Sequence, residues 1–270
     1  MILKDRKKPA KFKYPLAPGT DDRAEVERFN RLADEWWKAD GAFKVVHAFN
    51  AARIGKLSDS FKSILGRSDR LENALSGLTL LDVGCGAGIV SEPMANLGAK
   101  VTAIDASERN ILVAKKHAEI SRIQIDYQNA LPEELSERGD TFDIVMSLEV
   151  IEHVANPDEF LRLLTSLVKP SGILAIGTIN RTVTSFIKAI IGAEHVMRWL
   201  PKGTHHWRKF VRPEELDQIV LCSNFAMAMT CGVDFNPFRQ QWCTTTNLNS
   251  IYLRVYKRCD AKPELRPHLR

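Results

Sequence analysis

Leu80-Leu81-Asp82-Val83-Gly84-Cys85-Gly86-Ala87-Gly88 is the segment that best indicates the fold of this chain. It begins as a short apolar run, which is typical of a buried strand, and ends in three glycines at alternating positions. Glycines directly after a strand allow a tight turn and let backbone N–H groups approach a ligand at the start of the next helix. The stretch therefore predicts a nucleotide-type cofactor site beyond this strand.

A second apolar run, residues 101–104, ends in Asp105 and completes the pattern. A carboxylate at the tip of a second strand can accept hydrogen bonds from both hydroxyls of a ribose. Gly84, Gly86 and Gly88 are spaced G-x-G-x-G, one residue shorter than the dinucleotide fingerprint, which favours a ligand without phosphates. Asp82, at the entry of the turn, is placed to stabilise a positively charged or amino-bearing ligand. The simpler alternative is that the glycines only form a turn.

The remaining strand and helix signals predict an α/β fold with a mostly parallel, Rossmann-like sheet of seven strands. The strands are expected at residues 79–83, 100–104, 123–127, 142–147, 173–178, 226–233 and 250–256. Helices are expected between them at 88–97, 107–120 and 157–168, and another opens at Arg212-Pro213. Upstream, helical spacing predicts helices from Asp21 to Trp36, at 43–57 and at 58–75. The Trp36-Trp37 pair fits either helix packing or a pocket wall.

Composition and charge indicate an ordinary globular protein. The chain has 270 residues, of which 44% are apolar and 26% charged, and its net charge is +5. We expect a flexible basic leader at 1–20, a helical cap at 21–77, the α/β domain at 78–258 and a polar tail at 259–270. The five cysteines match no C-x-x-C pattern and indicate reduced thiols in a cytosolic protein. No apolar run approaches the ~20 residues that span a bilayer, and the N-terminus lacks a secretory signal.

The glycine stretch, together with Ala103-Ile104-Asp105-Ala106-Ser107, resembles the S-adenosylmethionine-dependent methyltransferases of the seven-stranded Rossmann-like class. The resemblance covers roughly residues 78–258. It implies that the glycine turn lies against the methionine part of S-adenosylmethionine and that Asp105 binds its ribose.

The segment after the fourth expected strand contains Glu149, Glu152 and His153, which share one face of a helical turn. Ligands of such sheets bind beyond the carboxyl ends of the strands, so this segment lies at the active-site mouth. Methyl transfer to a phenol requires loss of the phenolic proton. His153 could take that proton as a general base, or the three side chains could hold a divalent cation that lowers the acceptor's pKa. The plainer alternative is that His153 only shapes the pocket.

An irregular stretch at 181–210 interrupts the alternation of strands and helices. Phe186, Ile190, Ala193, Met197 and Leu200 form one helical stripe, flanked by basic residues Lys188, Arg198 and Lys202. Such a helix suits the surface of an anionic membrane, and equally a lid over the pocket. His205-His206 could suggest a metal, but without a third ligand nearby loop structure is the better interpretation.

This stretch narrows the resemblance to the ubiquinone-biosynthesis O-methyltransferases. The matching motifs are Trp36-Trp37, Phe43-Lys44, Asn50 with Arg53, Asn180-Arg181-Thr182, Gly192-Ala193-Glu194, 198–205 and Asn236-Pro237. The resemblance implies methylation of a polyprenyl ring hydroxyl at two steps, on 2-polyprenyl-6-hydroxyphenol and 3-demethylubiquinol. It also implies peripheral association with the inner membrane through residues 181–207, and contact with other ubiquinone-biosynthesis proteins.

By the same resemblance, the cofactor contacts fall on Arg53, Gly84, Asp105 and Leu148, and a divalent cation such as Mg²⁺ falls on Glu149, Glu152 and His153. The chain departs from the family pattern at His206, where the family usually has Asp. It also departs at 247–252, which lacks the family's Asn-Tyr-Met. Both departures bear on substrate preference rather than on the chemistry.

Three other functions fit parts of the sequence. Methylation of oxygen or nitrogen on a different small aromatic would use the same cofactor site without needing the 181–207 stretch. An inactive scaffold could keep the cofactor pocket. A nucleic-acid-binding role for the basic leader is disfavoured, since only Phe12 and Tyr14 offer stacking aromatics there.

Overall fold

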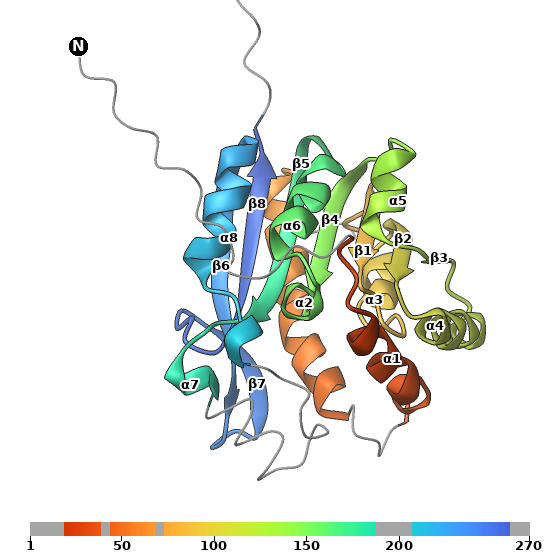
Figure 1. Ribbon diagram of the computed structural model, residues 1–270, viewed down its shortest axis with the longest axis horizontal. Coiled ribbons are helices and arrows are strands. Elements are labelled where there is room, and N and C mark those ends of the chain that lie inside the picture. Colours follow the sequence, from red (N-terminus) through yellow and green to blue (C-terminus); the bar gives the residue numbers. More distant parts are fainter. Residues whose placement is uncertain (1–18, 39–43, 68–72, 187–206, 260–270) are drawn as a thin grey trace, which may run out of the picture.

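The computed structural model describes residues 19–38, 44–67, 73–186 and 207–259, which form one eight-stranded sheet between two layers of helices (Figure 1). The strand order is β3-β2-β1-β4-β5-β8-β6-β7. The first five strands in this order pair in parallel, whereas β8, β6 and β7 pair antiparallel. The strands are β1 Thr79–Val83, β2 Lys100–Asp105, β3 Asp126–Asn129, β4 Phe142–Leu148, β5 Val168–Ile179, β6 Phe225–Asn236, β7 Gln241–Thr245 and β8 Ile251–Arg258.

Alternation along the strands creates a core on each face of the sheet. In β1, Leu80 packs in a core with helix α2 (Lys44–Ile64), while Leu81 packs in the opposite core with α6 (Pro157–Ser166). The remaining helices are α1 Arg23–Leu32, α3 Ser91–Asn96, α4 Glu108–Ser121, α5 Pro132–Glu137, α7 Val183–Ser185 and α8 Pro213–Val220, with short 3₁₀ turns η1 Ala33–Glu35, η2 Ile151–His153, η4 Trp207–Lys209 and η5 Leu221–Ser223.

The predicted α/β, mostly parallel sheet is confirmed, but the predicted number of strands was one too few. The missing strand is β7, whose sequence QWCTT pairs only with β6 at the edge of the sheet. None of its five residues is fully buried, so its sequence has no apolar run. The turn predicted at 169–172 lies inside β5, where the register shifts and Ser171 adopts a φ of 60°. The third strand begins three residues later than predicted, at Asp126.

The helices differ from the prediction in two places. The separate helices expected at 43–57 and 58–75 are a single helix, α2, that ends at Ile64 just before Gly66, whose φ is 64°. Helix α5 was not predicted; it begins at Pro132, and the Leu131 N–H donates to the Glu134 carboxylate. The apolar stripe expected at 186–200 lies almost entirely outside the described residues.

Helix α1 lies at the carboxyl ends of the parallel strands, apart from the two helical layers (Figure 1). Asp22 caps it by accepting from the N–H groups of Ala24 and Glu25. The helix has no fully buried residue, and the Nζ of Lys209 on η4 pairs with Asp22 at 3.0 Å. Because α1 lies at the carboxyl ends of the strands (Figure 1), it covers the edge of the sheet where ligands of this fold class bind.

Candidate active site

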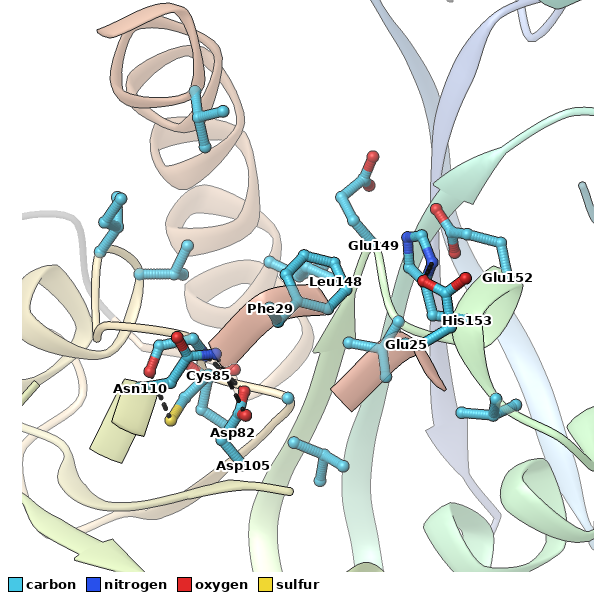
Figure 2. A pocket seen from close by; sticks show the side chains of 18 of the residues that line it. Glu25, Phe29, Asp82, Cys85, Asp105, Asn110, Leu148, Glu149, Glu152 and His153 are labelled. Atoms are coloured by element: carbon cyan, nitrogen blue, oxygen red, sulfur yellow. Dashed lines mark hydrogen bonds and ion pairs between the residues drawn. The ribbon is translucent and has the colours of Figure 1, made fainter. Parts of the chain in front are cut away.

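A cavity of about 740 Å³ lies at the carboxyl edge of the sheet, within the range of ordinary small-molecule sites. It is lined by the ends of β1, β2, β4 and β5, by α1 and α2, and by the β6–β7 hairpin. Figure 2 shows its two polar ends, with Asp82, Asp105 and Asn110 at one and Glu25, Glu149, Glu152 and His153 at the other. Phe29 and Leu148 lie between them. The cavity can therefore bring two ligands together.

The glycine turn forms one end of this cavity. Gly84 and Cys85 donate their N–H groups to the carbonyl of Ile104 at 2.8 and 3.0 Å, which joins the turn to β2. Gly84 has a φ of 73°, and a Cβ there would lie 2.3 Å from a methyl of Val150. Only glycine satisfies both conditions, so this position explains why the turn needs the residue.

Asp105 holds the glycine turn in place. Its carboxylate accepts from the N–H groups of Gly86 and Ser107, both at 2.8 Å. Asn110 donates to Asp105 at 3.3 Å and accepts from the indole N–H of Trp36 at 3.1 Å. Burial raises the pKa of Asp105, although these hydrogen bonds oppose the shift. An acceptor group is thus held at the tip of β2, beside the backbone of the turn.

Asp82 is the second carboxyl at this end, and it is buried, with 3% of its surface exposed. It accepts from the Ser91 hydroxyl at 2.6 Å. Burial raises its pKa to about 6, against the opposing influence of Ser91 and of the nearby Arg53 cation. A carboxylate that is costly to bury in the free protein gains most from a cationic ligand.

Arg53 places a cation under the cavity. It is 3% exposed, its Nε donates to Asn50 at 2.7 Å, and its guanidinium lies 4.3 Å from the centre of the Phe49 ring. One guanidinium nitrogen pairs with the Glu149 carboxylate at 2.9 Å. Glu149 itself has a φ of 59°. This backbone conformation is unusual for residues other than glycine and recurs at functional sites.

Glu152 and His153 turn to different partners. Glu152 is 3% exposed and accepts from the Thr178 hydroxyl at 2.8 Å, and burial, with the nearby Glu149 charge, raises its pKa well above the ordinary range. His153 Nδ1 lies 3.1 Å from the Glu25 carboxylate of α1. Burial tends to raise the pKa of Glu25, but the His153 imidazole together with the cations of Arg28 and Lys209 outweighs it, so this pKa is lowered.

Comparison with known proteins agrees with this geometry. A family model described as a methyltransferase domain matches residues 51–228. The ubiquinone biosynthesis O-methyltransferase of Rhizobium etli is 43% identical over 242 residues, which is 90% of this chain and 98% of the relative. The enzyme of the same name from Sinorhizobium fredii is 44% identical over 88% of this chain and 96% of the relative. This chain belongs to the ubiquinone biosynthesis O-methyltransferases.

Solved structures show the same fold at lower identity. Magnesium protoporphyrin IX methyltransferase from Synechocystis, determined with S-adenosylmethionine bound, aligns with a TM-score of 0.59 and 19% identity. The alignment covers 90% of this chain and all of that chain. A possible histamine N-methyltransferase from Thermotoga maritima aligns at 0.57 with 16% identity, over 88% of this chain and all of that chain. These similarities concern the fold alone.

The residues that the sequence predicted for this family site all line one cavity except Gly88, which follows in the turn. They are Arg53, Gly84, Gly86, Asp105, Leu148, Glu149, Glu152 and His153. The three predicted metal ligands, however, do not converge. Glu149 pairs with Arg53, Glu152 with Thr178 and His153 with Glu25. Among the described residues, no group of three or more His, Cys, Asp and Glu side chains is placed to hold a metal ion. This arrangement does not fit a metal.

Sequence reasoning missed several residues of the methyltransferase site. Asn110 and Glu25 were not singled out, and Trp36, for which the sequence left helix packing and a pocket wall as alternatives, lines the cavity. Strand β7 was not predicted, so the β6–β7 hairpin was not recognised, yet it contributes Phe235 and Trp242 to the cavity. A signal existed for Glu25, because it precedes Phe29 by four residues and both therefore lie on one helix face.

The described residues include no helix long and apolar enough to cross a bilayer. All five cysteines are free, and Cys85 is the one that lines the cavity.

Proposed function

We propose that this enzyme transfers a methyl group from S-adenosylmethionine to a ring hydroxyl of a polyprenyl phenol. The acceptors would be 2-polyprenyl-6-hydroxyphenol and 3-demethylubiquinol. Family membership supports the pathway, and one observation supports the chemistry: a single cavity joins the glycine turn and Asp105 to His153. A donor bound at one end would present its methyl group to an acceptor at the other.

The donor would be held by the residues around β1 and β2. Asp105 would accept from the ribose hydroxyls, and the turn at Gly84, Gly86 and Gly88 would lie along the methionine part. Arg53 would pair with the donor's carboxylate, since it is a buried cation beside the cavity. Leu148 would pack between donor and acceptor, in keeping with its place between the polar ends in Figure 2.

The acceptor would lie beside His153. The imidazole takes the proton of the ring hydroxyl, and the phenolate oxygen attacks the methyl carbon of the sulfonium in line. The new O–C bond forms as the C–S bond breaks, and the electron pair of the C–S bond stays on sulfur. Charge balances, because the cationic sulfonium is replaced by a cationic imidazolium. The imidazolium then loses its proton to water.

A divalent cation stays a prediction of the family resemblance. The proton transfer and displacement described above involve no metal, because Glu149, Glu152 and His153 face separate partners. Turnover measured before and after treatment with a chelator tests the prediction. Loss of activity that Mg²⁺ restores would support a metal, and would require these three side chains to rearrange.

The acceptor's apolar tail would leave the cavity along its aromatic wall. Phe49, Phe235 and Trp242 form a cluster there, with ring centres 5.1 and 5.6 Å apart for the two pairs that include Trp242. The helical cap at 21–77 would cover the site, since α1 and α2 both line it. We also propose that residues 181–207 bind an anionic membrane surface from the cytoplasmic side and deliver the substrate, and that partner enzymes of the pathway meet the protein there.

Turnover of a catechol that carries a prenyl tail, compared with the same catechol without it, tests the substrate assignment. We expect a clear preference in kcat/KM for the tailed substrate. Equal use of both would instead favour a small aromatic acceptor.

Replacement of Ile187, Ile190 and Ile191 by Ser should abolish binding to anionic liposomes, and unchanged binding would contradict the membrane proposal.

A further inference from the structure

Helix α1 brings a carboxylate to the proposed base from 128 residues away in sequence. We infer that Glu25 is a positioning residue for methyl transfer, which holds the His153 imidazole in the orientation and tautomer that the reaction requires. The inference rests on the proposed role of His153 as the base. It makes α1 a part of the active site.

The contact between the two residues is direct and shielded from water. Glu25 Oε2 lies 3.1 Å from His153 Nδ1, and the side chains are 12% and 13% exposed. Phe29, one helical turn further along α1, packs edge-on against the imidazole with ring centres 5.3 Å apart. Figure 2 shows Glu25 meeting one side of the ring, while the second ring nitrogen points away from it. The helix thus fixes both the position and the tilt of the ring.

The carboxylate is itself fixed. Arg28, on the same helix, places its guanidinium 2.7 Å from the oxygen that faces His153, and Lys209 of η4 lies 4.0 Å from the other oxygen. The carboxylates nearer to His153 in sequence are engaged elsewhere, Glu149 with Arg53 and Glu152 with Thr178. Among the described side chains, Glu25 is the carboxylate bonded to this imidazole.

The contact between Glu25 and His153 sets which imidazole nitrogen can accept a proton. A neutral imidazole carries one N–H, and a carboxylate at Nδ1 keeps that proton there, so that Nε2 presents its lone pair. When Nε2 accepts the acceptor's hydroxyl proton, the ring becomes cationic and the Glu25 carboxylate stabilises it. The same arrangement of carboxylate and imidazole assists the base in serine hydrolases, on an unrelated fold.

The test is a double-mutant cycle on the full chain. We would measure kcat, the acceptor KM, the S-adenosylmethionine Kd and the melting temperature for Glu25→Gln, His153→Ala and the double variant, with a prenylated catechol as acceptor. Glu27→Gln is the matched control, because it removes the same charge from the same helix at a side chain that is 64% exposed.

We expect Glu25→Gln to lower kcat about 10- to 100-fold, with KM and Kd within about twofold of the native values. In the His153→Ala background the same change should cause no further loss, because Glu25 acts through the imidazole. Glu25→Asp, which keeps the charge on a shorter side chain, should give an intermediate kcat. Glu27→Gln should behave as the native enzyme.

Two outcomes would overturn the inference while leaving the proposed base in place. One is an equal loss from Glu25→Gln in both backgrounds, and the other is a loss that appears in Kd or melting temperature rather than kcat. Either would assign Glu25 a purely structural role in docking α1. Full activity of His153→Ala would refute the proposed base itself, and the inference with it.

Discussion

At the level of single residues, the site combines a buried carboxyl, Asp82, and a half-buried one, Asp105, with a turn that only glycine can form. Asp82 and Asp105 lie under one end of the cavity, and burial raises the pKa of both. Such groups cost the free protein stability and favour a cationic ligand. The features of Asp82 and Asp105 that favour ligand binding therefore also lower the stability of the free protein.

Replacing Asp82 by Asn should change how stability depends on pH. The folded-state pKa of about 6 lies above the ordinary value of 3.8, so ionisation of Asp82 destabilises the native protein as pH rises through this window. The free energy of unfolding of Asp82→Asn, relative to native, should increase by about 2–3 kcal/mol between pH 4 and pH 7 and stay level above. Urea unfolding at both pH values measures it. Asp59→Asn, a change at a side chain that is 72% exposed, is the control.

Replacing Gly84 by Ala should combine backbone strain with a clash. Gly139 has nearly the same φ, 74° against 73°, but an added Cβ there would meet nothing within 4 Å. Gly139→Ala should therefore cost about 1–2 kcal/mol of stability from strain alone. Gly84→Ala should cost about 1–3 kcal/mol more, because its Cβ would meet Val150. Equal losses in the two variants would contradict the steric account.

At the level of elements, helix α1 has no fully buried residue, and its N-cap also joins it to η4. Asp22 serves both contacts, since one oxygen accepts from the first-turn N–H groups and the other pairs with Lys209. The helix is accordingly the part of the site whose docking is easiest to weaken selectively.

Asp22→Ala should loosen α1 without unfolding the sheet. Loss of the cap costs about 1 kcal/mol, and loss of the ion pair adds a smaller amount. We expect faster hydrogen exchange of the amides of α1, with unchanged exchange in β1 and β4. Lys209→Met keeps the cap and should produce a smaller increase. Exchange that rises equally throughout the molecule would show that α1 has no independent stability.

At the level of the whole molecule, the cavity joins the ends of β1 and β2 to α1 and α2, so a ligand there should stabilise the protein as a unit. S-adenosylmethionine at 100 times its Kd should add about 2.7 kcal/mol to the free energy of unfolding. Thermal unfolding with and without the compound measures this, and Asp105→Ala should remove most of the effect. An undiminished shift in that variant, together with unchanged affinity by calorimetry, would refute the assigned site.

The sequence alone predicted the fold class, and it predicted the glycine turn and Asp105 that line one end of the cavity. Both depend on local signals: short apolar runs set β1 and β2, and the glycine spacing with Asp105 follows from backbone geometry within about 25 residues of chain. The family could be predicted for the same reason, because each of its motifs is a short run of neighbouring residues. Buried strands and tight turns produce such patterns, since few residue types fit each of their positions.

Which side chains come into contact depends on the tertiary structure. Strand β7 and helix α5 left weak signals, because an exposed edge strand and a short helix take their stability from neighbours. The partners of Glu149, Glu152 and His153 depend on where α2, β5 and α1 bring Arg53, Thr178 and Glu25. Spacing placed three potential metal ligands on one turn, but long-range contacts direct each of them elsewhere. Such contacts join residues far apart in the chain, and no local pattern encodes them.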